Sequence, residues 1–401
     1  MEFQSSAETS PSDFITEEQS RQLIGRPPAS GGWRDGDPAG DRQFAPLSNL
    51  ELESGRVLPS YRVAFETWGQ LNDDNSNAVL ILHGLTGDSH AAGPASKEHP
   101  TDGWWRNIIG PGLAIDTNKF FIVAPNHLGG CQGTTGPSSL DSSGREFGSN
   151  FPYVTIRDQV KAQRALSHLI GIKHWHAIVG GSMGAMHALE WAIEYPDELS
   201  RVAAIAGTAV STSDQIATNS VQIEAIRSDA NFNGGHYYDA KPGFGPHQGL
   251  ALARRMALLN YRSHSELNDR FARAWQSGVS PLGGGGRFAV ESYLDFHGNK
   301  FTRRFDANSY ITLVESMNSH DVGRGRTSVE SALASIKHKA LVLGISSDRL
   351  FPIEEQQFIA DHIGGELVGN GLQVVHSEFG HDGFLIEDKL VGPFITQLLE
   401  S

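Results

Sequence analysis

The sequence predicts a protein of the α/β class, with a mostly parallel sheet, helices on both of its faces and an inserted group of helices. Short apolar runs of strand length recur along the chain, and such runs are typical of strands buried on both faces of a parallel sheet. Segments with helical spacing separate these runs, as in βαβ units. Between residues 211 and 326, however, helical segments follow one another without a buried strand.

The expected elements follow from these patterns in chain order. The first strand, Tyr61–Trp68, places Val63 and Phe65 on one face, and the later strands are continuous apolar runs. Those later strands are Ala78–Leu82, Phe120–Ala124, Trp175–Val179, Val202–Ile205, Ala340–Leu343 and Leu372–Val375. The expected helices are Gln159–Ile170, Ser182–Tyr195, Gln215–Ile226, Gly249–Asn260, Ser265–Trp275, Ser309–Met317 and Glu387–Leu399.

The domain organisation predicted from these elements has three parts. Residues 1–45 are rich in Ser, Glu, Gly and Pro and show no apolar period, so we expect a flexible arm, with structure beginning near Leu47. Residues 46–210 and 327–401 form the core. Residues 211–326 form a helical lid subdomain inserted between two strands of that core.

Composition excludes several function classes. The 401-residue chain is 39% hydrophobic, with a formal net charge of −14 that argues against nucleic acid or an anionic membrane as its main partner. A local basic pocket for a phosphorylated cofactor is still compatible with that charge. The single cysteine, Cys131, permits no internal disulfide, which fits a reducing cytoplasm. No secretory signal and no apolar run of the roughly 20 residues needed to cross a bilayer is seen, so we expect a cytoplasmic protein.

A candidate nucleophile lies between an expected strand and an expected helix. Residues 180–184 read Gly-Gly-Ser-Met-Gly and match G-x-S-x-G, which in this strand–turn–helix setting indicates the nucleophile elbow of an α/β-hydrolase fold. The sharp turn admits only small neighbours and exposes the Ser182 hydroxyl at the N-terminus of a helix, where the helix dipole is positive. A turn without chemistry is the alternative reading of the pentapeptide alone.

The acid and the base follow from chain order, because such folds present serine, acid and histidine in that sequence. Asp348 and His381 each lie just past an expected strand, where loops build the active sites of these sheets. His381 would take the Ser182 proton, and Asp348 would fix its tautomer. The rival pair His320 and Asp321 lies in the expected insertion, away from a strand end, where a role in the pocket or in lid packing stays open.

The tetrahedral oxyanion of acyl chemistry needs two hydrogen-bond donors. One is expected to be the backbone N–H of Met183, directly after the serine. The other comes from the loop after the strand Ala78–Leu82, where the backbone N–H of Leu85 is the candidate. These residues support acyl transfer through a serine, and they fit an esterase, a thioesterase or an acyltransferase equally.

Several longer blocks narrow the choice by resemblance. Together they are similar to the homoserine O-acetyltransferase family of methionine biosynthesis, from about Leu50 to the C-terminus. Gly84 is often Ala in that family, and residues 185–187 also depart from its commoner pattern, which bears on the acyl donor more than on the acceptor. The blocks are residues 83–90, 103–105, 110–112, 126–139, 151–152, 155–158, 180–184, 189–192, 259–262, 287–294, 318–321 and 380–385.

The resemblance implies roles for further residues. Arg254 falls on the arginine that engages the homoserine carboxylate, Asp382 on the aspartate that meets its ammonium group, and Thr86 on a residue that lines the same pocket. It also implies an α/β-hydrolase fold, acetyl transfer from acetyl-CoA to L-homoserine by a ping-pong mechanism, and a homodimer formed through the lid. No bound cofactor and no metal site are expected. A homoserine O-succinyltransferase, a serine O-acyltransferase, a plain serine esterase and a non-catalytic binding protein remain as alternatives.

Overall fold

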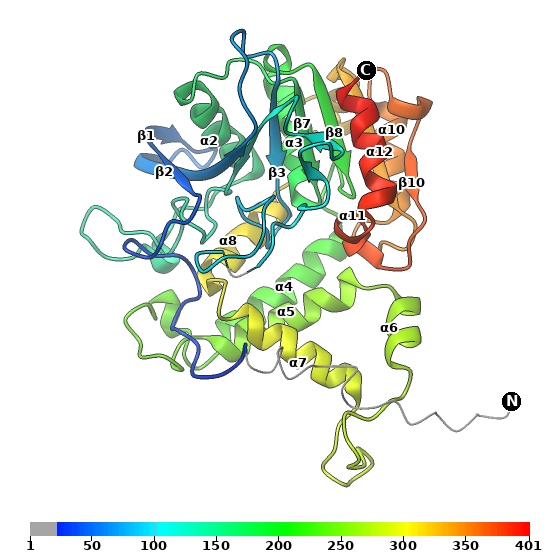
Figure 1. Cartoon of the computed structure of the whole chain (residues 1–401). Helices are drawn as coiled ribbons and strands as arrows, with labels where there is room; N and C mark the ends of the chain where they lie inside the picture. The colour runs from blue at the N-terminus through cyan, green and yellow to red at the C-terminus, as the bar shows by residue number, and fades with distance from the viewer. Residues whose placement is uncertain (1–21, 100) are drawn as a thin grey trace, which may run out of the picture.

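In the computed structural model, which describes residues 22–99 and 101–401, a sheet with flanking helices lies above a second group of helices (Figure 1). The sheet has eight strands in the order β1-β2-β6-β3-β7-β8-β9-β10. β2 pairs antiparallel with both β1 and β6, and all other neighbours are parallel. The strands are β1 Gln43–Glu51, β2 Val57–Trp68, β3 Ala78–Leu82, β6 Phe121–Pro125, β7 Ala177–Gly181, β8 Arg201–Ile205, β9 Lys339–Ile345 and β10 Gln373–Val375, and a separate short pair is β4 Ile109–Gly110 with β5 Ile115–Asp116.

Strand β3 shows why the central strands are continuous apolar runs. All five of its residues are buried, with Leu80 and Leu82 in the apolar core on one face of the sheet and Val79 and Ile81 in the core on the other. Alternate side chains of a strand point to opposite faces, so a strand covered on both sides needs apolar residues at every position. The prediction of a mostly parallel sheet with helices on both faces is confirmed.

Two sets of helices cover the sheet. Apolar side chains of α2, α3, α9 and α10 enter the core that contains Leu80, whereas α11 and α12 supply the core that contains Val79. Helix α2 begins at a capping box in which Thr155 and Asp158 satisfy each other's backbone N–H groups. The bounds are α2 Ile156–Leu169, α3 Met183–Glu194, α9 Val329–Ser335, α10 Ile353–His362, α11 Gly383–Ile386 and α12 Asp388–Leu399.

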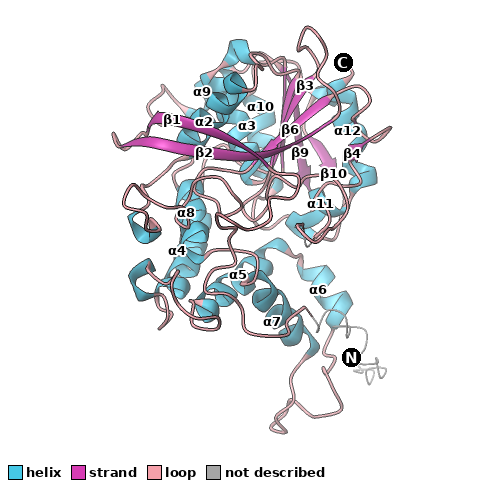
Figure 2. Ribbon diagram, turned by 60° about the vertical axis from the view of Figure 1, so that its left-hand side comes forward, coloured by secondary structure: helices cyan, strands magenta, loops and turns pink. Residues whose placement is uncertain are grey.

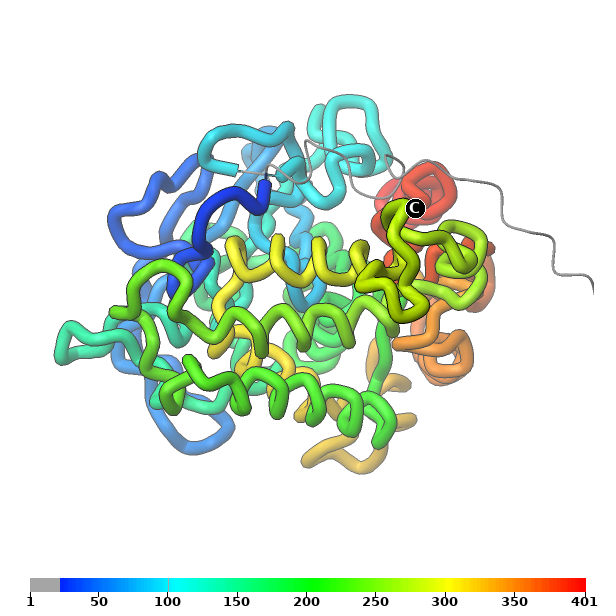
Figure 3. Tube along the Cα trace, turned by 90° about the horizontal axis from the view of Figure 1, so that it is seen from below, coloured from blue at the N-terminus to red at the C-terminus, as the bar shows by residue number. Residues whose placement is uncertain are grey.

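Six α-helices lie between β8 and β9 in the described chain, and the first five of them, α4 to α8, form the layer beneath the sheet (Figure 2). Helices α4, α5 and α7 lie side by side across this layer when it is viewed from below (Figure 3), and α8 packs against α4. Among the described residues, none of the helices is both long and apolar enough to span a membrane. The helices are α4 Ser213–Arg227, α5 His247–Tyr261, α6 His264–Phe271, α7 Ala289–Phe301 and α8 Ala307–Asn318.

Helix α7 was not among the expected elements, nor were α9 and α10. Gly298 weakens the helical signal of α7, since glycine lowers helix propensity by about 1 kcal/mol. The packing explains it: a Cβ at Gly298 would lie 2.9 Å from the carbonyl oxygen of Ala251, so the glycine lets α5 and α7 approach. Helix α6 ends at Phe271, before the expected Trp275, because the chain turns to a positive φ of 42° at Ala272.

Ordered structure starts before the expected Leu47. Strand β1 begins at Gln43 and pairs with β2. Upstream of it, Gly31 N–H donates to the carbonyl of Phe305 and Trp33 N–H donates to that of Cys131. The expected flexible arm of residues 1–45 therefore includes a segment that pairs and packs, which the scarcity of apolar residues concealed. Its first 21 residues lie outside the described part of the chain.

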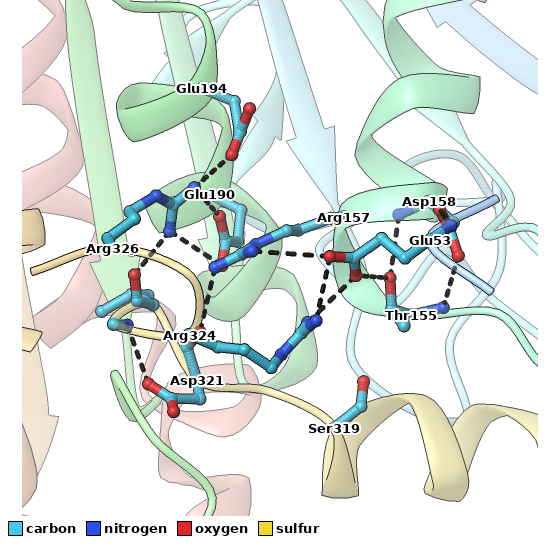
Figure 4. A network of polar contacts seen from close by, with 12 residues as sticks. Glu53, Thr155, Arg157, Asp158, Glu190, Glu194, Ser319, Asp321, Arg324 and Arg326 are labelled. Carbon is cyan, nitrogen blue, oxygen red and sulfur yellow. Dashed lines mark hydrogen bonds and ion pairs between the residues drawn. The ribbon is translucent and has the colours of Figure 1, made fainter. Parts of the chain in front are cut away.

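A network of charged side chains joins the segment that returns from the inserted helices to α2 and α3 (Figure 4). Arg157 on α2 contacts Glu53 and the buried Glu190 on α3. Arg324 pairs with Glu53 at 2.9 Å, and Arg326 pairs with Glu190 at 2.8 Å. These contacts fix the inserted helices to the core beside the sheet.

Candidate active site

The turn from β7 into α3 holds Ser182 in a conformation that few non-glycine residues adopt, with φ 59° and ψ −123°. The glycines around it are required by close backbone approaches. A Cβ at Gly180 would lie 1.9 Å from the carbonyl oxygen of Gly184, and one at Gly184 would lie 2.0 Å from that of Leu82. Such strain persists only where its surroundings enforce it, and it is common at functional sites. The pattern G-x-S-x-G thus has a steric origin in this chain.

Three of the predicted residues meet at the carboxyl ends of the strands. The Oγ of Ser182 lies 2.8 Å from Nε2 of His381, and Nδ1 of His381 lies 2.6 Å from Oδ2 of Asp348. The other carboxylate oxygen of Asp348 accepts the N–H groups of Leu350 and Phe351 at 2.8 and 3.0 Å. All three side chains are buried. The carboxylate therefore orients a histidine that can accept the serine proton.

The environment of His381 shifts its pKa and holds its ring in place. Burial acts to lower the pKa of His381, but the adjacent Asp348 carboxylate outweighs burial and raises that pKa above its ordinary value. The rings of Tyr261, Phe351 and Phe384 pack around the imidazole with centroid distances of 5.4 to 5.8 Å. This apolar surround limits the positions of the ring and strengthens its interaction with the carboxylate.

The two candidate oxyanion donors belong to residues near the serine: Met183 follows it in the chain, and Leu85 lies in the loop after β3. The backbone N–H groups of Leu85 and Met183 donate to no acceptor within the described ranges. The loop bearing Leu85 passes close to the nucleophile, since a Cβ at Gly84 would lie 3.7 Å from Ser182 Oγ. Free N–H groups beside an activated serine are the arrangement that stabilises a tetrahedral oxyanion.

A column of three buried histidines supports this loop, a feature that sequence reasoning missed. The ring of His127 stacks on that of His83 at 3.7 Å and on that of His187 at 4.1 Å. His83 Nδ1–H donates to the carbonyl of Gly84, and His127 Nε2–H donates to that of His83. Burial lowers the pKa of His83 to about 4, so the ring is neutral near pH 7. The carbonyl of Gly84 shares its peptide plane with the N–H of Leu85, so the column sets the direction of that donor.

A cavity opens beside Ser182 and His381. The predicted residues Leu85, Thr86 and Asp382 line it, and Arg304 and Tyr261 line it as well. Asp382 pairs with Arg262 at 3.3 Å. Arg304 donates to the carbonyl of Thr86 and pairs with Asp88, which explains how an arginine can lie in this wall. The adjacent arginines at positions 303 and 304 were the sequence signal that could have indicated an arginine in the wall of this cavity.

The predicted carboxylate-binding residue, Arg254, lies at the edge of this site and lines an adjoining cavity. Its Nη1 donates to Thr86 Oγ1 at 3.3 Å, and its guanidinium lies over the rings of Tyr261 and Phe301. No carboxylate of the described residues lies within ion-pair distance of Arg254. Its charge is thus stabilised by aromatic rings and remains available to an anion.

The rival pair His320 and Asp321 lies apart from the serine. His320 is buried and donates from Nε2 to the carbonyl of Thr208, and burial lowers its pKa to about 3. Asp321 accepts the N–H of Gly323 and pairs its backbone with Val210. Both residues thereby tie the end of α8 to the loop after β8, which is a packing role.

A second buried acid–base cluster contains Glu66, His90 and His99, whose ligand atoms lie within 4.8 Å of one another. The Nδ1 of His90 lies 2.9 Å from Glu66 Oε2, and the rings of His90 and His99 stack at an interplanar angle of 9°. Imidazole binds a metal in its ring plane, and two stacked planes cannot share one ion without turning. Burial acts to lower the pKa of His90, but the adjacent Glu66 outweighs burial and raises that pKa. The contact and the raised pKa together favour an ion pair between His90 and Glu66.

The fold, the elbow and the Ser182–His381–Asp348 contacts define the class of the molecule, an α/β-hydrolase-fold enzyme. The sequence pattern of the alpha/beta hydrolase fold family matches residues 77–388. A homoserine O-acetyltransferase of Leifsonia xyli subsp. xyli is 61% identical over 396 residues, covering 99% of this chain and 98% of the relative. The chain belongs to the homoserine O-acetyltransferase family.

Solved structures agree on the fold and include two activities. A homoserine O-acetyltransferase from Bacillus anthracis has a TM-score of 0.81 at 27% identity, covering 90% of this chain and 97% of that one. The esterase E22 has a TM-score of 0.80 at 28% identity, covering 89% and 99%. The backbone shape alone therefore does not separate transfer from hydrolysis.

Proposed function

We propose that this protein transfers the acetyl group of acetyl-CoA to the side-chain hydroxyl of L-homoserine through an acetyl ester on Ser182. The observation that carries the proposal is the hydrogen-bonded series from Ser182 through His381 to Asp348 in a chain of this family. The activity itself, homoserine O-acetyltransferase, follows from family membership over nearly the whole chain. The roles of the individual residues are the part that experiment must test.

The first half-reaction forms the acetyl-enzyme. Ser182 Oγ attacks the thioester carbonyl carbon while its proton passes to His381 Nε2, and the carbonyl oxygen takes the negative charge. The N–H groups of Leu85 and Met183 stabilise that charge. When the C–S bond breaks, the leaving thiolate takes the proton from His381, so coenzyme A departs and acetyl-Ser182 remains.

The second half-reaction transfers the acetyl group to the acceptor. The hydroxyl of homoserine gives its proton to His381, and its oxygen attacks the ester carbon. The bond to Ser182 Oγ then breaks and the serine regains the proton. Arg254 holds the substrate carboxylate and Asp382 holds its ammonium group. The planar guanidinium matches a carboxylate in two hydrogen bonds.

Hydrolysis is the second candidate, and one observation favours it: the esterase E22 has almost the same backbone. A succinyl donor or serine as acceptor would also use the same residues. Water attacking acetyl-Ser182 would give acetate and release the serine by the same proton path. The transferase must therefore bind homoserine before water reaches the ester.

Quenching the protein after it has reacted with acetyl-CoA, and before homoserine is added, tests the proposal. Mass spectrometry should find one acetyl group on the peptide containing Ser182, and added homoserine should remove it as O-acetyl-L-homoserine. The Ser182→Ala variant should release no thiol and still unfold at the wild-type urea concentration. Acetyl label on another residue would contradict the proposal. Rapid acetate release without acceptor would favour the esterase, and preference for succinyl-CoA would change the donor.

The assembly and location are part of the same proposal. Residues 211–326, which include helices α4–α8, act as a lid over Ser182. Exposed apolar residues on these helices, among them Val221, Leu252 and Leu259, suit a homodimer formed through the lid. The reaction needs acetyl-CoA as a co-substrate and no bound cofactor, and a cytoplasmic location would supply it.

A further inference from the structure

A basic cavity lies next to the Ser182 site. It is lined by Arg254, His297, Lys300, Arg303 and Arg304, together with two polar side chains and Phe301, and no acidic residue of the described chain is among its lining residues. The chain as a whole carries a net charge of −14. The cavity is therefore locally positive although the chain as a whole is negative. Such a local positive field attracts anions.

Arg304 pairs with Asp88, but the other arginine and lysine side chains of this cavity have no ion-pair partner within the described chain. Lys300 has no carboxylate within ion-pair distance there, and Arg303 donates to the backbone carbonyls of Leu23 and Gly25. Burial and the neighbouring Arg304 lower the pKa of Lys300, and burial lowers that of His297 to about 4. Uncompensated cations at a partly buried site repel one another, and a bound anion would relieve that repulsion.

Three of the five basic side chains come from one stripe of a helix. His297, Lys300 and Arg304 are spaced three and four residues apart along α7 and its continuation, so they share a face. Cations near a helix C-terminus also interact with its dipole, and that stabilisation could account for Lys300 alone. It does not account for Arg303 and Arg304, which lie beyond the end of α7 and line the same cavity.

The basic cavity adjoins the catalytic one, since Thr101 and Arg304 line both. We propose that this cavity binds the phosphate groups of the acyl donor's nucleotide, with Lys300 as the principal residue, while the thioester reaches Ser182 past Arg304. The inference rests on the proposed function and names where the anionic end of its donor lies. A plain esterase acting on small acetyl esters has no use for such a site.

The chemistry of the donor fits two adjoining cavities, one for its phosphates and one for its thioester. Coenzyme A places its phosphates at one end of a long uncharged arm and its thioester at the other, so a cationic cavity beside the nucleophile can hold one end while the other reacts. Lysine contributes a compact charge with three donors, which suits phosphate oxygens. Both the 3′-phosphate and the diphosphate offer this chemistry.

The test compares acetyl donors with and without phosphates on the purified full-length protein. Lys300→Glu should raise the KM for acetyl-CoA roughly tenfold, since it replaces attraction of phosphate by repulsion. The KM for S-acetylpantetheine, which has the thioester arm but no phosphate, should change less than about twofold because screened charges elsewhere contribute little. The matched control is Lys173→Glu, an equal charge change on an exposed residue beyond the cavity lining.

Each outcome decides the proposal. An equal rise in KM for both donors, or no rise in the KM for acetyl-CoA, would overturn the proposed phosphate site. The proposed function would still hold in that case, because the wild-type protein remains active. A wild-type protein that does not react with acetyl-CoA overturns the proposed function as well. If acetyl-3′-dephospho-CoA no longer distinguishes the variant from the wild type, the 3′-phosphate lies at Lys300. If the difference persists, the diphosphate does.

Discussion

At the scale of single residues, the site depends on a few hydrogen bonds between buried groups. The carboxylate of Asp348 fixes the ring of His381, and that ring contacts Ser182. A second set of bonds, from the rings of His83 and His127, fixes the peptides next to Leu85, whose N–H is the candidate oxyanion donor. Buried hydrogen bonds of this kind are stronger than exposed ones, and losing one leaves its partner unsatisfied.

The first prediction concerns Asp348→Asn. The amide keeps the shape but removes the charge that raises the pKa of His381, so burial then lowers that pKa. His381 must be neutral to act as a base, so the acidic limb of kcat/KM should move to lower pH, while kcat falls about 10³- to 10⁴-fold. A pH profile of thiol release measures both. A limb that stays in place or moves to higher pH would show that Asp348 does not control this base.

The second prediction concerns the histidine column. His83→Phe keeps the ring stacking but removes the donor to the Gly84 carbonyl, so kcat should fall between about tenfold and a hundredfold with little change in the KM for homoserine. His83→Asn can donate to the same oxygen and should recover part of kcat. Steady-state kinetics beside urea unfolding separates the effect from instability. Equal activity of the two variants would argue for a purely structural ring.

At the scale of elements, the elbow is positioned by the packing of β3, β7 and α3, and the inserted helices are positioned by ion pairs. Gly180 and Gly184 allow the strand and helix backbones to meet at distances that a Cβ would block. Glu190 lies inside α3 and contacts both Arg157 of α2 and Arg326 of the returning segment (Figure 4). One buried carboxylate thus joins three segments.

The third prediction compares Glu190→Ala with Glu194→Ala. Removing Glu190 leaves the partly buried guanidinium groups of Arg157 and Arg326 with only their more exposed partners, Glu53 and Glu194, so the free energy of unfolding should fall by about 3 kcal/mol. Glu194 is more exposed and contacts only Arg326, so its loss should cost less than about 1 kcal/mol. Urea unfolding measures both variants, with Glu190→Gln as a milder change if the alanine variant does not fold. Equal losses would contradict the bridging role of Glu190.

At the scale of the whole molecule, the interior contains several neutral histidines. Burial lowers the pKa of His83 to about 4 and those of His187 and His320 to about 3, and it also lowers the pKa of His127. In the unfolded chain each of these rings regains a pKa near 6.5. Protons therefore bind the unfolded state first as the pH falls.

The fourth prediction follows from that difference. The contribution of these rings to stability should be complete above about pH 6.5 and should be lost as the pH falls toward about 4 and 3, by on the order of 3 kcal/mol for each of His83, His187 and His320. His90 and His381 have raised pKa values, so their contributions change above pH 6.5 and do not offset this loss. Urea unfolding midpoints at pH 6.5, 5.5 and 5 should decrease in that order, and an unchanged midpoint would contradict the prediction.

The sequence by itself determined the class of fold, the elbow and the order of the catalytic candidates. Apolar runs such as Ala78–Leu82 report burial on both faces directly, and G-x-S-x-G reports two close backbone approaches. Helix α7 was not predicted because Gly298 weakens its helical pattern, and the reason for that glycine, the close approach of α5, is seen only in the packed structure. Local sequence patterns reflect local requirements for burial and close approach, and these were sufficient to predict the strands of the sheet.

Only the tertiary structure decided which distant side chains share a surface. It brought His83, His127 and His187 into one column and gathered Lys300 and Arg254 around one cavity. Neither grouping has a period or spacing in the chain, because each depends on how helices and loops from separate segments pack. Cooperation between such residues arises from distances in space, and the sequence order contains no direct measure of those distances.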